Sequence, residues 1–209
     1  MYLPGHFAES RVDVLHEGIR HSGLATLVTT GPDGLDASHV PLLLEPAPEP
    51  LGRLVGHVAR ANPQWQTALP GAEALAIFLG PDAYVTPSWY ATKRETGRVV
   101  PTWNYVAIHA HGCVRFFHER ACLLDVVTRL TERYEQPRAT PWKVADAPAD
   151  YLDSMLRGIV GFELTIARLE GKWKASQNRS EADRRGVEEG LEREGREAMA
   201  RLVRGPKDG

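Results

Sequence analysis

The stretch VVPTWNYVAIHAHGCVRFFH, residues 99–118, decides the fold class, because it predicts one long strand or two shorter ones. Further strands are predicted on both sides of it: 24–30, 35–44, 53–59, 73–80, 83–89 and 159–171. Such a series of strands with helices outside predicts a mainly β fold with flanking helices (α+β), whose sheet is closed or half-closed. The sequence lacks the strand–helix alternation, GxGxxG and GxxxxGK[ST] patterns of classical nucleotide-binding folds.

Helices are expected at four places around this sheet: 10–22, 62–69, 119–135 and 149–157. The third is the most clearly amphipathic, and its apolar face is expected to hold Cys122, Val126, Val127, Leu130 and Tyr134. Pro41 cannot donate to a strand ladder, so an edge or a bulge is expected there. The polar run 91–97 is expected to be a mobile loop.

The 209 residues suffice for one sizeable domain, which we expect to span residues 1–180. Residues 181–209 are expected to form a charged C-terminal helix or tail. Its apolar residues are sparse, which favours a solvated, partly frayed helix: Val187, Leu191, Met199 and Leu202.

The chain carries 25 basic and 27 acidic residues, a formal net charge of −2. Direct DNA binding remains possible but has no support from charge, because no dense run of Lys and Arg occurs. Cys113 and Cys122 are expected to be reduced thiols of an intracellular protein. No secretory signal and no apolar run of about 18 residues is visible, so the cytoplasm is the expected compartment.

Three segments carry more polar and aromatic residues than a plain barrel needs. The first is GHVARANPQW, residues 56–65. Asn62 and Pro63 favour a helix start, whose free N–H groups beside Arg60 would suit an anionic phosphate. A simple helix cap with a surface arginine would explain the same residues.

The second segment pairs PSWY at 87–90 with VVPTWNY at 99–105. Its tryptophans and tyrosines could form flat walls for a ring system, and Asn104 offers an amide donor and acceptor. Ordinary core packing is equally compatible with these aromatic residues.

The third segment is EGKWKASQNR, residues 170–179. Lys172 and Lys174 share one side of an extended chain, because side chains alternate with a period of two. Two ammonium groups so placed could hold a phosphate, although a solvated basic turn would have the same sequence.

His109 and His111 would also share a strand face. No third ligand with recognisable spacing accompanies them, so we predict no metal site. They are expected to line a pocket or to pair with neighbouring side chains. No GxSxG elbow and no Cys–His signature is present, so nucleophilic hydrolysis has no support.

Five blocks closely resemble the PaiB family of negative transcriptional regulators, in the family's order. They are MYLPGHF, GHVARANPQW, GPDAYVTPSWY followed by Lys93, VVPTWNYVAIHAHG, and IVGFELTIARLEGKWKASQNR. The resemblance extends from Met1 to about Gly190. Ala175 departs from the pattern, because a leucine is expected before the Ser-Gln-Asn run.

The resemblance implies an FMN-binding split barrel related to pyridoxamine-phosphate oxidases, working as a homodimer with FMN at the interface. It implies cofactor contacts by Ser38, His39, Val40, His57, Arg60, Asn62, Gln64, Trp65, Trp103, Asn104, Lys172, Lys174, Gln177 and Asn178. The implied function is negative transcriptional regulation with flavin as sensor or ligand. An FMN-dependent oxidoreductase acting on a small molecule is the alternative, because fold does not settle function.

Overall fold

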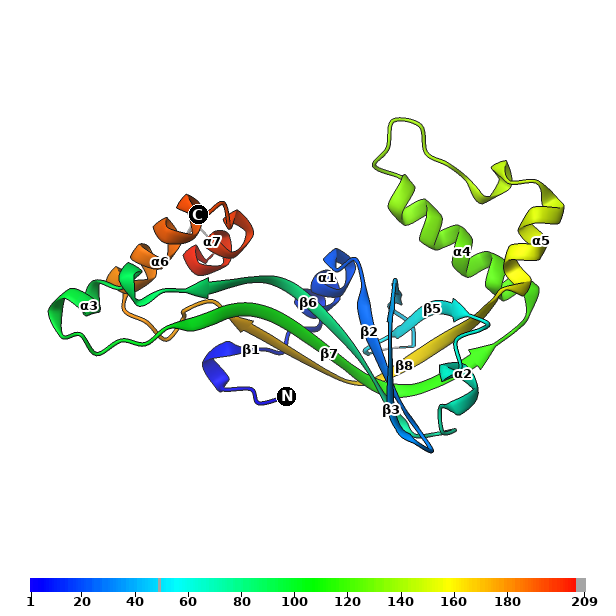
Figure 1. Ribbon diagram of the computed structural model, residues 1–209, viewed down its shortest axis with the longest axis horizontal. Helices are drawn as coiled ribbons and strands as arrows, with labels where there is room; N and C mark the ends of the chain where they lie inside the picture. Colours follow the sequence, from blue (N-terminus) through cyan, green and yellow to red (C-terminus); the bar gives the residue numbers. More distant parts are fainter. Residues whose placement is uncertain (49, 206–209) are drawn as a thin grey trace. The chain divides into compact units, whose positions relative to one another are not determined.

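The computed structural model describes residues 1–48 and 50–205. Its strands are β1 Ala8–Glu9, β2 Ala25–Gly31, β3 Gly34–Val40, β4 Leu43–Glu45, β5 Arg53–Ala59, β6 Glu73–Val85, β7 Thr102–Phe117 and β8 Ile159–Lys174. Its α-helices are α1 Val12–His21, α2 Gln64–Thr67, α3 Ala91–Glu95, α4 Arg120–Glu135, α5 Ala149–Arg157, α6 Glu181–Arg193 and α7 Glu197–Arg204. Short 3-10 turns are η1 Gly5–Phe7, η2 Pro87–Trp89 and η3 Val144–Asp146. The α+β prediction is confirmed (Figure 1).

The strands of the described chain form one sheet in the order β3-β2-β6-β7-β8-β5-β4, with β1 added to β8. β2 pairs antiparallel with β3 and β6, and β5 pairs antiparallel with β4 and β8. β3 and β4 lie at opposite ends of this order, yet only Pro41 and Leu42 separate them in sequence. The sheet must therefore curl until its ends meet, as in a split barrel. Pro41 lies in the break between these two edge strands, as expected.

The chain divides into two compact units. The barrel unit comprises His16–Phe78 and His109–Leu169, and the terminal unit comprises Met1–Leu15, Leu79–Ile108 and the described residues from Glu170 onward. β6, β7 and β8 each contribute residues to both units. The two units are described separately below.

One core cluster of the barrel unit lies under α4 and α5. Leu123, Val126 and Leu130 of α4 pack with Leu156 of α5 against apolar side chains of the sheet: Leu43, Val55 and Phe117. The predicted helix range is confirmed, but its predicted face is partly wrong. Cys122 is exposed and Tyr134 is 41% exposed, because the helix turns Leu123 toward the sheet instead.

The core of the terminal unit is built by α6 and α7, which lie side by side in Figure 1. Val187, Leu191 and Met199 are fully buried and pack with the end of β6 and with Tyr90. The expected solvated, frayed tail is therefore wrong. Its sparse apolar residues suffice because two short helices fold back on each other and share one core.

Two further expectations differ from the structure. Residues 73–80 and 83–89 do not form separate strands, because β6 continues through Pro81 to Val85 and 87–89 is a 3-10 turn. The expected mobile loop at 91–97 contains helix α3. A buried carboxylate fixes that helix, since Asp183 accepts hydrogen bonds from Thr92 N (2.9 Å) and Thr92 Oγ1 (2.8 Å). Within the described residues, no helix is both long and apolar enough to cross a bilayer.

Candidate functional site

The residues predicted to contact FMN fall into two groups, one in each unit. The barrel cluster contains Ser38, His39, Val40, His57, Arg60, Asn62, Gln64 and Trp65. The terminal cluster contains Trp103, Asn104, Lys172, Lys174, Gln177 and Asn178. Each group is described within its own unit.

In the barrel cluster, Asn62 and Gln64 join the turn after β5 to the β2–β3 hairpin. Asn62 Nδ2 donates to Ser38 Oγ (2.8 Å), and Asn62 Oδ1 accepts from Gln64 N (2.9 Å). Gln64 is fully buried, and its Nε2 donates to Leu27 O (3.2 Å) and Thr29 Oγ1 (3.1 Å). The N–H of Gln64 at this helix start, which was expected to be free, therefore donates a hydrogen bond to the Asn62 side chain. The network fixes the shape of this corner of the barrel.

Arg60 points its guanidinium at carbonyl groups. Its Nε donates to Arg157 O (2.6 Å) and its Nη2 to Ile159 O (2.9 Å), so the side chain holds the turn between α5 and β8. The indole Nε1 of Trp65 donates to Arg60 O (2.9 Å). These bonds position Arg60 without neutralising it, because none of its acceptors among the described residues is a carboxylate.

Three other members of the barrel cluster differ in exposure. His39 is exposed, with Nδ1 3.0 Å from Thr26 Oγ1, whereas Val40 is buried in the core. His57 on β5 is half-buried, and its Nδ1 has no hydrogen-bond partner among the described residues. Burial lowers the pKa of His57 below its usual value, since desolvation disfavours the imidazolium ion. His57 is thus a neutral imidazole at neutral pH.

In the terminal cluster, the two lysines lie on alternate positions of β8, as predicted. Lys172 is buried, donates to Tyr2 O (3.0 Å), and lies over the rings of Tyr2 and Tyr105 at 5.5 and 5.3 Å. Lys174 donates to Thr102 Oγ1 and to Trp103 O (2.6 Å). Neither ammonium group meets a carboxylate among the described residues.

The remaining members of this cluster surround the lysines. Asn104 is buried and its Nδ2 donates to Ser176 Oγ (2.9 Å). Trp103 is 55% exposed and meets Tyr84 edge to face, with centroids 6.0 Å apart. Gln177 closes the turn after β8, since its Nε2 donates to Trp173 O (2.5 Å), and Asn178 is exposed beside it.

The terminal cluster carries an excess of positive charge. Arg179, which sequence reasoning missed, lies with its guanidinium carbon 4.7 Å from the ring centroid of Tyr90 and forms no ion pair within the described chain. Desolvation lowers the pKa of Lys174, and the charges of Lys172 and Arg179 lower it further. Three cations crowded without an acidic partner fit a dianionic phosphate, and exposed Trp103 offers an adjacent flat apolar surface.

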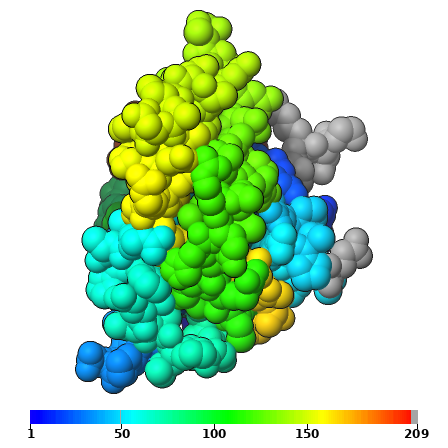
Figure 2. All heavy atoms as spheres, turned by 90° about the vertical axis from the view of Figure 1, so that its right-hand side faces the viewer, coloured from blue at the N-terminus to red at the C-terminus, as the bar shows by residue number. Residues whose placement is uncertain are grey.

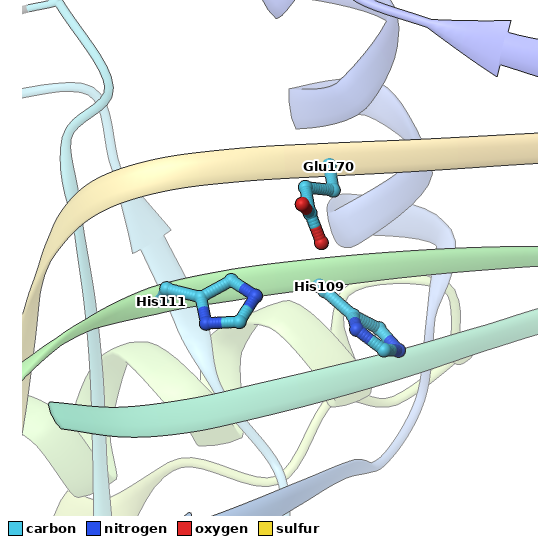
Figure 3. A group of neighbouring side chains, drawn as sticks. All are labelled: His109, His111 and Glu170. Carbon is cyan, nitrogen blue, oxygen red and sulfur yellow. The ribbon is translucent and has the colours of Figure 1, made fainter. Parts of the chain in front are cut away.

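His109 and His111 both extend from β7, with ring centroids 6.1 Å apart (Figure 3). His111 is buried, and its Nδ1 lies 3.6 Å from a carboxylate oxygen of Glu73 on β6. His111 thus pairs with a neighbour, which is one of the two roles expected for these histidines.

Comparisons with known proteins support the same cofactor. Residues 1–168 match the family model described as "Putative FMN-binding domain". The chain is 34% identical to the protease synthase and sporulation protein PAI 2 of Bacillus subtilis, over 93% of this chain and 90% of that protein. It is 35% identical to an uncharacterised protein of Emericella nidulans, over 98% of this chain and 96% of that protein.

Among solved structures, the flavocytochrome Anf3 of Azotobacter vinelandii superposes with a TM-score of 0.57 at 12% identity, covering 80% of this chain and 69% of that one. Fold and comparisons together define a split-barrel protein of the flavin-binding class. The chain belongs to the PaiB-like family of FMN-binding domains, and its cofactor is FMN.

Proposed function

We propose that this chain is a cytoplasmic, homodimeric FMN-binding regulator. Each flavin would be bound by the barrel cluster of one subunit and the terminal cluster of the other. The observation that carries this proposal is the group of Lys172, Lys174 and Arg179, which has no carboxylate partner in the described chain. A dianionic phosphate would supply the negative charge that balances these three cations.

The two clusters suit different parts of the cofactor. Lys174 and Arg179 would hold the phosphate, while Trp103 would lie along the isoalloxazine ring. In the barrel cluster, Ser38 and Asn62 present a hydroxyl and an amide on a rigid frame, as hydrogen bonding to the polar edge of a flavin requires. When bound, FMN supplies a redox-active ring that could report the redox state or the presence of a ligand.

The regulatory role is supported by the relative from Bacillus subtilis, which is named a protease synthase and sporulation protein. The near balance of acidic and basic residues disfavours strong non-specific DNA binding, so regulation through a bound ligand or a protein partner is the simpler form.

The second candidate is an FMN-dependent oxidoreductase acting on a small molecule. His57 favours it, because a partly buried neutral imidazole whose Nδ1 has no partner among the described residues can accept a hydrogen bond or a proton from a bound substrate. Multiple turnovers with a reduced nicotinamide donor and a released product would decide for the enzyme. Deletion of the gene followed by return of the unchanged protein or of a variant that cannot bind flavin tests the regulator. If transcript levels change on deletion and only the flavin-binding protein restores them, the regulator is supported.

A titration of apoprotein tests the flavin site. Replacing Lys174 by alanine should weaken FMN binding by about 1.5–3 kcal/mol, the usual contribution of a hydrogen bond to a charged group, or roughly ten- to a hundredfold in Kd. Riboflavin affinity should change far less, because riboflavin lacks the phosphate. Lys143→Ala, which removes an exposed lysine of the barrel unit, is the matched control. Equal losses for FMN and riboflavin would contradict a phosphate contact.

A further inference from the structure

The barrel unit contains a small cavity whose only member from the barrel cluster is Arg60. It has a volume of about 190 Å³. Three segments meet around it, namely the turn after β5, the junction of β7 with α4, and the end of α5. Figure 2 shows this face, where the cyan, green and yellow parts of the chain come together. The lining residues are Arg60, His118, Arg120, Leu123, Asp153, Leu156 and Arg157.

The described lining of this cavity is rich in guanidinium groups. Three arginines face a single carboxylate, that of Asp153, which accepts from Arg120 Nε (2.9 Å). The side chain of Arg157 makes no hydrogen bond or ion pair with a described residue. Glu119 lies between the lining residues His118 and Arg120 in sequence. Its carboxylate accepts a hydrogen bond from His118 N (3.1 Å), and the residue lines a neighbouring groove instead.

Arg60 is held in place by the backbone of the same region. Its bonds to Arg157 O and Ile159 O occupy Nε and Nη2, and Nη1 lies 3.5 Å from His118 Nδ1. These bonds also offset the negative end of α5, which would otherwise repel an anion. The first turn of the 16-residue helix α4 borders the cavity through Arg120 and Leu123, and it adds the partial positive charge of a helix start.

We propose that this cavity binds a phosphate group, either inorganic phosphate or a small phosphate monoester. Guanidinium groups bind phosphate oxygens through paired hydrogen bonds, and the unpaired Arg157 is free to supply such a pair. Arg60 would add a preorganised cation on the opposite segment. The cavity shares Arg60 with the barrel cluster, whereas the proposed flavin-phosphate contacts of Lys174 and Arg179 lie in the terminal unit.

The test is a calorimetric titration of the FMN-saturated protein in phosphate-free buffer. Inorganic phosphate and glycerol phosphate are added in separate experiments. We expect saturable binding of at least one probe at one site per chain, and at least tenfold weaker binding to Arg157→Gln. Arg185→Gln, which removes one exposed arginine of α6, should bind as the unchanged protein does. The tighter probe identifies the source of the phosphate group.

Flavin absorbance recorded during the titration separates this site from the FMN site. The proposal requires FMN to stay bound while phosphate saturates. Release of FMN in proportion to bound phosphate would overturn it, as would the absence of saturable binding or equal binding to Arg157→Gln. Arg157→Lys guards against misfolding, because it keeps the charge and should bind phosphate more tightly than Arg157→Gln.

Discussion

At the scale of single residues, close contacts explain the glycines within the long strands. A Cβ added to Gly112 of β7 would lie 1.9 Å from the carbonyl oxygen of Thr165 on β8. Backbone cannot move away as a flexible side chain can, so only glycine allows the two strands to approach this closely. The glycine between His111 and Cys113 is therefore a packing requirement of the barrel unit.

The depressed pKa of His57 predicts a pH dependence of stability. Because the folded-state pKa lies below the unfolded value of about 6.5, the unfolded chain takes up the proton first as the pH falls. The free energy of unfolding should therefore decrease from pH 6.5 down to the folded-state pKa and then level off. Urea unfolding of the flavin-free protein across this range, at fixed protein concentration, measures it.

The matched variant for this prediction is His57→Gln, which keeps a polar side chain but cannot titrate. It should lose less stability than the unchanged protein between neutral and mildly acidic pH. An identical pH dependence in both proteins would assign the effect to another group.

The barrel cluster also shows what residue patterns can predict. The motif GHVARANPQW indicated a helix start at Asn62-Pro63, and α2 begins directly after it at Gln64 but ends at Thr67, two residues short of the predicted helix. The Asn62 side chain accepts from Gln64 N, as the helix-cap interpretation of this motif expects. The motif did not indicate that Arg60 binds the backbone carbonyls of Arg157 and Ile159. Those contacts join positions about 100 residues apart, and no local pattern encodes them.

At the scale of elements, strands were predicted better than the segments between them. The range 53–59 coincides with β5, since alternation and turn residues are local signals. Helix α3 was missed because Asp183, 91 positions from Thr92, supplies its stabilising contact. The pair α6 and α7 was underestimated because its core depends on Tyr90 and on the end of β6.

Asp183 is expected to be essential for the attachment of α6 to α3. Asp183→Asn leaves one acceptor for the two donors of Thr92 and removes the charge, so unfolding should become easier by about 1–3 kcal/mol. Asp150→Asn, at an exposed position at the start of α5, is the control and should change stability by less than about 0.5 kcal/mol. Chemical unfolding with tryptophan fluorescence measures both. Equal stability of the two variants would remove Asp183 from this role.

At the scale of the whole molecule, the proposed dimer has a thermodynamic signature. If each flavin contacts both subunits, FMN binds the dimer more tightly than the monomer and must stabilise association. Sedimentation across a concentration series should show a lower dimer dissociation constant with FMN than without it. Dilution of the holoprotein should release flavin. A monomer that retains stoichiometric FMN at low micromolar concentration would refute the shared site.

The division into units also bears on how the protein is made. Both units are assembled from separate stretches of chain, and three long strands contribute to each. During synthesis, the last segment of the barrel unit, which ends at Leu169, is made before α6 and α7, which begin at Glu181 and Glu197. The core of the terminal unit, by contrast, cannot form until the last part of the chain has been synthesised. Until then Tyr90 and the end of β6 lack their covering helices, so ribosome-bound or truncated chains ending near residue 170 should expose this apolar surface to chaperones and proteases.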